Sequence, residues 1–408
     1  PPAAAGPAAD TEVAGDFAAT VSDPGSAPAG DTETAHEGVG WGWAPGDTPA
    51  GVMVAGVAER FSDGTGDPWA GWLAETLRLG NGPPGAALAS VGSGSGRQGL
   101  GLHATAVQGV ISANTTWSGT VHITSDLLIA GGVVVAVEPG TVIKVARGSW
   151  IAVSGTLDAR GTADRPIIFT SVRDDSVGED LTGEEATTAN PGEWEQLVFE
   201  GGSGSSVLQN VEIRYPGMSN PGNNDFRDGL LIRGGSSPRL ESVRVREVAS
   251  HGVRVLDGSP VLRGVDVQGA GGVPFYITLN ADPVFDGITA SGNRAEGLWV
   301  DGGNLAAVRE WGVTNMPYMV NSNLVISRGG LLRLKAGVIV KMDRGAYLQS
   351  TGGDGRVEAL GTAGSPVIIT AWADDSAGGD TLRDGSAGNQ AAVPGLWEAI
   401  YLETNSVL

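Results

Sequence analysis

The clearest pattern in this chain is a short apolar motif that recurs at nearly constant spacing between residues 206 and 300. The motif has the form L-x-x-V-x-V, and its leading residues Leu240, Leu262 and Phe285 lie 22 and 23 positions apart. The dipeptides "SP", "SP" and "DP" keep the same period. Several short β-branched runs within each period predict one coil of a parallel β-helix, in which each strand pairs with its equivalent one coil away.

Equivalent positions of a β-helix stack on one another, so the repeat predicts the columns of the core. The predicted interior columns are Leu240 with Leu262 and Phe285, and Val243 with Val265 and Ile288. Short apolar runs broken by Gly, Pro and Asp continue on both sides of this section. We therefore expect an all-β fold, a parallel β-helix (solenoid) over residues 111–408; its right-handed sense is implied by the family resemblance given below.

The first part of the chain lacks this period. Residues 1–37 are rich in Pro, Ala, Gly and Asp, which predicts a disordered linker. Residues 38–110 form a small Trp-containing segment, and "DPWAGWLAETLRLG" has the capping residues of a short helix near 68–79. Its Trp face suits packing against a neighbour, and stacking on a carbohydrate ring is the alternative.

A longer block occurs twice and carries an acidic loop each time. Lys144 and Lys341 lie in matching apolar strands, and both copies then run through "PIIFT" or "PVIIT" into a loop that begins Asp-Asp-Ser. The loop residues Asp174 and Asp180 recur as Asp374 and Asp380. Turns of solenoids tolerate small insertions, so we expect both stretches to leave equivalent coils.

The two acidic loops are candidate calcium sites. Carboxylates on a glycine-rich loop can converge on one cation, and Ca²⁺ accepts about six to eight oxygen ligands in irregular geometry. The candidate ligands are Asp174, Asp175, Asp180 and Glu184 in the first loop, and Asp374, Asp375, Asp380 and Asp384 in the second. The alternative is a solvated acidic turn that was duplicated together with its coil.

The composition limits the partners of the chain. With 25 Lys and Arg against 46 Asp and Glu, the formal net charge is −21, which argues against binding nucleic acid or an anionic membrane through bulk electrostatics. The absence of cysteine excludes disulfides and Cys-ligated metal sites. No apolar run reaches the length of a transmembrane helix.

Two further segment pairs carry a resemblance to a known family. "VEPGTVIKV" and "GTLDARGTADRPIIFTS" return as "LKAGVIVKM" and "GRVEALGTAGSPVIITA". These segments resemble the extracellular right-handed parallel β-helix repeat proteins of bacteria and archaea, in the pectate-lyase-like superfamily, and the resemblance covers residues 111–408. It implies an extracellular or cell-surface location, with activities that range from adhesion to polysaccharide cleavage.

The resemblance to polysaccharide lyases and hydrolases makes polar residues of the middle coils candidates for acid–base catalysis. The candidates are Asp257, Asp266, Asp282, Asp286 and Asp301, with Arg244, Arg254 and His251. Most of these Asp residues lie in turn sequences, where Asp favours the bend itself. We therefore expect a non-enzymatic adhesive or structural module, with a polysaccharide-degrading enzyme or a glycan-binding module as alternatives.

The last residues, "WEAIYLETNSVL", match a segment of the first copy that runs on into further strands. We expect additional coils of the same chain beyond Leu408, and a polysaccharide or cell-surface glycan as partner.

Overall fold

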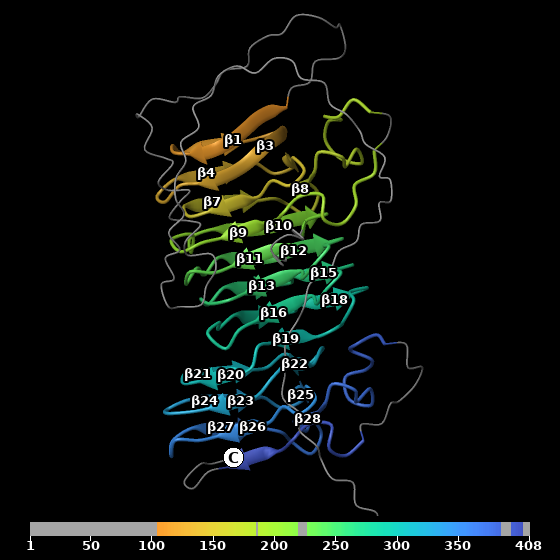
Figure 1. Ribbon diagram of the computed structural model, residues 1–408. Helices are drawn as coiled ribbons and strands as arrows, with labels where there is room; N and C mark the ends of the chain where they lie inside the picture. Colours follow the sequence, from red (N-terminus) through yellow and green to blue (C-terminus); the bar gives the residue numbers. More distant parts are fainter. Residues whose placement is uncertain (1–103, 185–186, 219–226, 385–392, 403–408) are drawn as a thin grey trace, which may run out of the picture. The chain divides into compact units, whose positions relative to one another are not determined.

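The computed structural model describes residues 104–184, 187–218, 227–384 and 393–402, all within the unit Gly96–Leu408. Every named element in these ranges is a β-strand, and neighbouring strands pair in parallel (Figure 1). The predicted all-β parallel β-helix is confirmed. The predicted linker over residues 1–37 and the helix near 68–79 lie outside the described residues.

Three ladders of strands make up the first part of the solenoid. Ladder A contains β2 (Thr115–Trp117), β4 (Val134–Val137), β7 (Thr156–Arg160), the start of β10 (Val207–Arg214), the start of β12 (Arg239–Arg246), β14 (Val261–Arg263) and β17 (Val284–Asp286). Ladder B contains the start of β1 (Thr105–Ile111), the start of β3 (Thr120–Ile129), β5 (Val142–Val145), β8 (Ile167–Ser171), the ends of β10 and β12, β15 (Asp266–Gln268) and β18 (Thr289–Ser291). Ladder C contains the ends of β1 and β3, β6 (Ile151–Val153), β9 (Leu197–Phe199), β11 (Leu230–Ile232), β13 (Val253–Val255), β16 (Phe275–Ile277) and β19 (Leu298–Val300).

The corner between ladders A and B is formed by a column of residues with left-handed backbone. Asn210, Ser242, Gly264 and Gly287 occupy equivalent positions in successive coils, and their φ angles are 49°, 54°, 60° and 62°. Glycine adopts this conformation without strain, whereas Asn and Ser do so at a cost. The sharp bend within β10 and β12 is thus a property of the corner position, which the later coils fill with glycine.

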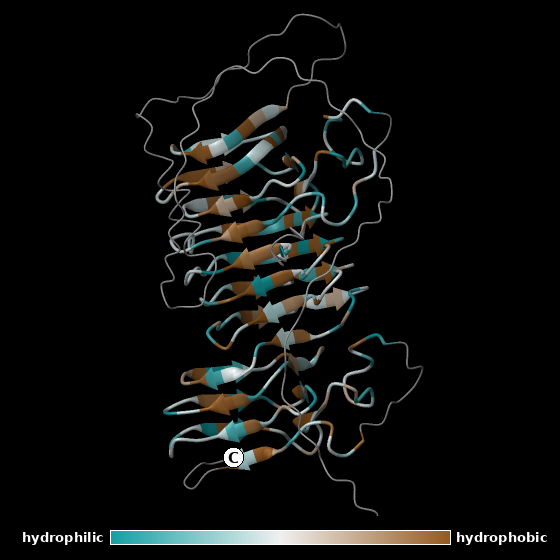
Figure 2. Cartoon of the chain, viewed as in Figure 1, coloured by the Kyte–Doolittle hydropathy of each residue, from teal (hydrophilic) through white to brown (hydrophobic). Residues whose placement is uncertain are grey.

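The interior of the solenoid is one continuous apolar cluster that runs from Trp117 to Val357. Hydrophobic residues recur in the strands along the stack (Figure 2). Leu240 pairs with Leu262, and Leu262 pairs with Phe285, as the repeat predicts. Phe285 is partly buried and packs against this cluster. The second predicted column, Val243 with Val265 and Ile288, is fully inside. Both predicted columns are confirmed.

Strands of the second copy of the repeated block do not join the ladder that holds their counterparts in the first copy. Its strands are β20 (Gly303–Leu305), β21 (Val308–Trp311), β22 (Tyr318–Val320), β23 (Leu324–Ile326), β24 (Leu331–Leu334), β25 (Ile339–Met342), β26 (Leu348–Ser350), β27 (Arg356–Ala359), β28 (Ile368–Ala371) and β29 (Ile400–Leu402). Ladder C continues from β19 into β22, β25 and β28, although the first-copy counterparts of β25 and β28 are β5 and β8 of ladder B.

Ladders A and B do not continue into the second copy. In the described part of the chain, β17 and β18 pair with no later strand, and β20 and β21 begin separate sheets with β23 and β24 (Figure 1). We call this junction, between β17–β19 and β20–β22, the seam.

Candidate functional site

Each acidic loop covers a buried lysine from the preceding coil. Lys144 in β5 and Lys341 in β25 have no exposed surface, although their strand neighbours are the residues that face the core. The ammonium group of Lys144 donates to the backbone carbonyl of Glu179. That of Lys341 donates to the carbonyl of Gly379 at 2.9 Å and to the hydroxyl of Thr381 at 3.0 Å. Both ammonium groups therefore lie beneath their loops on the outer face of the sheet.

The loops supply the negative charge that these buried ammonium groups require. Burial lowers the pKa of Lys144, and the carboxylates of Asp175 and Asp174 act in the opposite direction. Burial likewise lowers the pKa of Lys341, opposed by Asp375 and Asp374. A buried charge needs an opposite charge or hydrogen-bond partners, so the lysine and its loop form one structural unit.

The first Asp of each loop is held by side chains of the same copy. In Asp174, Oδ2 accepts hydrogen bonds from the Thr170 hydroxyl at 2.6 Å and from Nη1 of Arg214 at 3.4 Å. Its Oδ1 accepts from the backbone N–H and the hydroxyl of Ser176. Burial would raise the pKa of Asp174, but the Ser176 and Thr170 hydrogen bonds and the charge of Arg214 lower it overall. Asp374 repeats the contacts to Thr370 and Ser376.

The remaining predicted ligands have diverse surroundings. Asp175 accepts hydrogen bonds from the backbone N–H and hydroxyl of Thr187, and Asp180 accepts from the N–H groups of Thr182 and Gly183. Asp375 is half-buried, and the exposed predicted ligands are Asp180, Glu184, Asp380 and Asp384. Among the described residues, no three Asp, Glu, His or Cys side chains converge in a metal-holding group. Calcium binding stays a prediction.

The sequence did contain a signal for the buried lysines. Lys144 and Lys341 are single charged residues in the apolar strands "VIKV" and "IVKM", at matching positions of the two copies. An inward-outward alternation places such a residue on the outer face, where it is normally solvated. That the following loop folds back over it could not be inferred from the strand alone.

The candidate catalytic residues take part in contacts between coils. Asp301 accepts hydrogen bonds from the Tyr276 hydroxyl at 2.5 Å and from the Asn321 amide at 2.7 Å. Asp266 accepts from the Thr289 hydroxyl, and Asp257 from the backbone N–H of Gly235. The other pairs are Asp286 with Arg263, Asp282 with Arg309, and Arg254 with Asp228, while Arg244 is exposed.

His251 is set into the same network. Its Nδ1 accepts a hydrogen bond from the backbone N–H of Val273 at 3.1 Å, which joins two successive coils. Burial, with a contribution from the positive charge of Arg254, lowers the pKa of His251 to about 4. The imidazole is therefore neutral at physiological pH and acts as a hydrogen-bond acceptor within the fold.

An aromatic column on the outer face of ladder C was not expected from the sequence. We use this name for Arg254, Tyr276, Trp299 and Trp372. The Arg254 guanidinium lies 4.6 Å from the centre of the Tyr276 ring, and Tyr276 and Trp299 are nearly parallel, with an interplanar angle of 16°. Trp372, from the second copy, lies 4.7 Å from Trp299 between ring centres. The repeat period could have predicted the stacking of residues 254, 276 and 299, because they occupy equivalent positions of successive coils.

The described residues contain no helix with the length and apolar character of a membrane span. No protein-family model, curated protein or solved structure matches the chain. The structure by itself establishes a parallel-stranded solenoid of the β-helix type. Membership of the pectate-lyase-like superfamily stays a prediction.

Proposed function

We propose that this chain is a structural or adhesive β-solenoid module of an extracellular or cell-surface protein. The observation that supports it best is the use of polar side chains to join coils. Asp301, Asp266 and His251, which sequence reasoning offered as catalytic candidates, each bind groups of a neighbouring coil. Such contacts add side-chain hydrogen bonds between successive coils to the strand pairing and the shared core, which stiffens the stack.

The composition agrees with an extracellular role. The net charge of −21 favours solubility and opposes self-association. The chain has no cysteine, so its stability is independent of the redox state of the compartment. A solenoid with a continuous core offers a long outer surface on which binding sites can be distributed.

Surface labelling tests the location. Antibodies raised against residues 104–402 should stain intact cells of the source organism, and added protease should remove the signal, while a cytoplasmic marker stays unlabelled. Staining only after permeabilisation would overturn the extracellular assignment. The enzymatic alternative is tested by incubating the protein with acidic and neutral polysaccharides, with and without calcium. New reducing ends or unsaturated products, lost in Asp301→Asn, would favour an enzyme over a module.

The aromatic column supports a second candidate function, the binding of a glycan. Aromatic faces pack well on the apolar faces of sugar rings, and Tyr276 and Trp299 are partly exposed. Asp301 and Asn321, which flank the column, are hydrogen-bonding groups of the kind that orient sugar hydroxyls.

Retention on immobilised polysaccharides tests this binding. Trp299→Ala should lose retention, whereas Tyr401→Ala, which removes an exposed ring outside ladder C, should keep it. Equal retention of both variants would remove the column as a glycan site.

Calcium stays a proposed stabiliser of the two loops. A cation would have to share the loop carboxylates with Lys144 or Lys341, which lowers the expected affinity. Calorimetry with calcium on the wild type and on Asp180→Asn and Asp380→Asn variants tests it. Binding that weakens in both variants supports a calcium site in each loop, and no binding at millimolar calcium contradicts it.

A further inference from the structure

Among the described residues, fewer strand ladders cross the seam than join two successive coils of the first stack. Of the three ladders in the described part of the chain, only ladder C crosses it, through the pairing of β19 with β22. The apolar core nevertheless continues through the seam, because residues on both sides belong to one cluster. The two sides are thus held by core packing, one ladder and side-chain contacts.

Arg309 replaces a core residue at the seam. It lies in β21 in register with Leu332 of β24 and Val357 of β27, both of which are buried in the core. Its guanidinium crosses the seam and donates to the carbonyl oxygens of Leu279, Asn280 and Ala281, at 3.2, 3.0 and 2.9 Å. One side chain therefore satisfies backbone acceptors that a ladder strand would otherwise serve.

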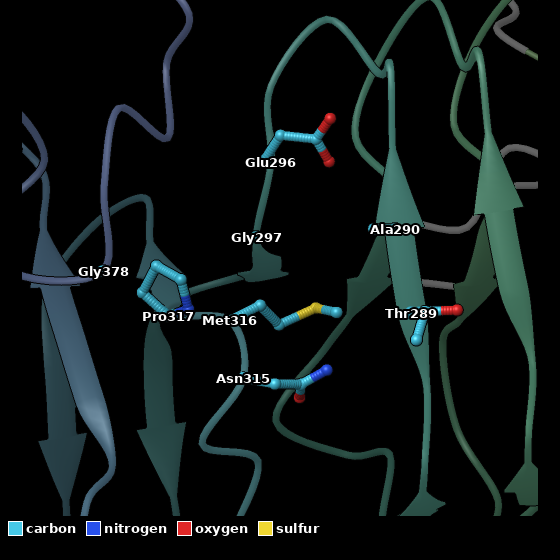
Figure 3. A pocket seen from close by; sticks show the side chains of 8 residues that line it. All are labelled: Thr289, Ala290, Glu296, Gly297, Asn315, Met316, Pro317 and Gly378. Carbon is cyan, nitrogen blue, oxygen red and sulfur yellow. The ribbon is translucent and has the colours of Figure 1, made fainter.

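A second polar side chain acts in the same way beneath ladder B. The Asn315 amide donates to the carbonyl oxygen of Ile288 at 2.7 Å, just before β18. Asn315, Met316 and Pro317 face Thr289 and Ala290 across a cavity of about 180 Å³, which Gly378 of the second acidic loop also lines (Figure 3). The residues that line this cavity therefore come from both sides of the seam.

The second acidic loop spans the seam from outside. The backbone N–H of Glu296 donates to the carbonyl of Thr381 at 2.7 Å, and Nη1 of Arg383 donates to the carbonyl of Asn293 at 2.7 Å. Arg383 also lies 3.6 Å from the Glu296 carboxylate. Trp372, at the start of the loop, packs against Trp299. The loop follows β28 yet binds the last coil of the first stack.

The two acidic loops share the features that contact the lysine strand but differ at the residues that reach across the seam. Both copies keep the Asp-Asp-Ser start and the glycine that packs near the lysine strand. The two side chains that reach across the seam, Trp372 and Arg383, stand where the first loop has Val172 and Gly183. Arg383 holds a left-handed backbone with φ of 50°, a conformation that favours the glycine of the first copy. The first loop makes its contacts inside its own stack.

We propose that the seam is a hinge of the solenoid and that Arg309 together with the second acidic loop is the latch that holds it closed. Ladder C and the shared apolar core are the connections that remain when the latch opens. The two β-stacks then change their mutual angle while each keeps its own ladders, in the manner of hinged domains.

The absence of cysteine allows a direct test in the full chain, because spin labels can be placed at chosen pairs. One pair, Asp286→Cys with Glu358→Cys, spans the seam from β17 to β27. The control pair, Arg160→Cys with Arg263→Cys, lies within ladder A of the first stack. Double electron–electron resonance measures the distance between the two spin labels of each pair. Both pairs are measured in the wild-type background and in the variant Trp372→Val/Arg383→Gly, whose second loop carries the residues of the first loop at these two positions.

We expect the distance distribution across the seam to broaden by about twofold or more in the loop variant, while the control pair is unchanged. Arg309→Met should have the same effect and provides a second variant should the loop variant fail to fold. Unchanged distributions across the seam in the variants would overturn the latch. Equal broadening of both pairs would show a general loosening of the solenoid and would also overturn it.

Discussion

At the scale of single residues, the buried lysines change the meaning of the acidic loops. A cluster of carboxylates read from sequence suggests an external cation, but here Lys144 brings a cation of the chain itself to the centre of the loop. Because the lysine and the carboxylates share one partly desolvated site, removing the lysine takes a counter-charge away from the loop, although Asp174 keeps its ion pair with Arg214.

Replacement of the lysine measures this dependence. Lys144→Met should lower the free energy of unfolding by about 1–3 kcal/mol, since it leaves Asp174 and Asp175 close together without the ammonium group. Lys335→Met, at an exposed lysine paired with Glu310, should cost no more than about 1 kcal/mol. Urea denaturation followed by circular dichroism checks both variants, and equal losses would argue against a special role for the buried lysine.

The pH dependence of stability provides a second test at this scale. The pKa of Asp174 is lowered from 3.8 in the folded chain, so its ionised form contributes stability that is present above about pH 4. That contribution is lost as the pH falls through the folded pKa. The difference in unfolding midpoint between wild type and Asp174→Asn should therefore be largest at neutral pH and shrink below pH 4. Glu184→Gln, an exposed change in the same loop, should show a small difference at every pH.

At the scale of elements, the corners decide where strands bend. The corner between ladders A and B requires a left-handed backbone conformation. Asn210 and Ser242 adopt it in two coils, and glycine adopts it in the next two. The second acidic loop likewise keeps the lysine contacts of the first loop. It adds two side chains, Trp372 and Arg383, that reach across the seam.

A single substitution tests the corner. Ser242→Gly should raise the free energy of unfolding by about 0.5–1 kcal/mol, because glycine relieves the left-handed strain that outweighs its larger entropy loss on folding. Ser291→Gly makes the same chemical change in strand β18, where the backbone is not left-handed, and should lower stability by a similar amount. Thermal unfolding of both variants gives the sign, and a loss of stability in Ser242→Gly would contradict the assignment of strain to this corner.

At the scale of the whole molecule, the solenoid combines a continuous core with interrupted ladders. The core crosses the seam without a break, while among the described residues ladders A and B end at β17 and β18 and two separate sheets begin at β20 and β21. The loss of stability caused by a substitution should therefore depend more on how deeply the residue is buried in the core than on where it lies along the chain.

Two substitutions in ladder A compare the inner and outer faces. Leu262→Ala, in the centre of the core column, should cost about 2–5 kcal/mol through lost burial and the cavity left behind. Val284→Ala, on the outer face of β17 with 54% of its surface exposed, should change stability by less than about 0.5 kcal/mol. The urea midpoints of the two variants measure the losses of stability. Comparable losses would contradict the prediction, because they would mean that Val284 on the outer face contributes as much as Leu262 in the core.

The sequence by itself determined the coil, because strand period, turn residues and interior columns are local properties that repeat. Leu240, Leu262 and Phe285 could be placed in one column from their spacing alone, and the two acidic stretches could be recognised as equivalent loops. Tertiary structure alone decided what those loops touch. The phase shift at the seam, the folding of each loop over its lysine, the packing of Trp372 on Trp299 and the contacts of Arg309 depend on which coils lie next to each other, and the repeat period does not encode these contacts.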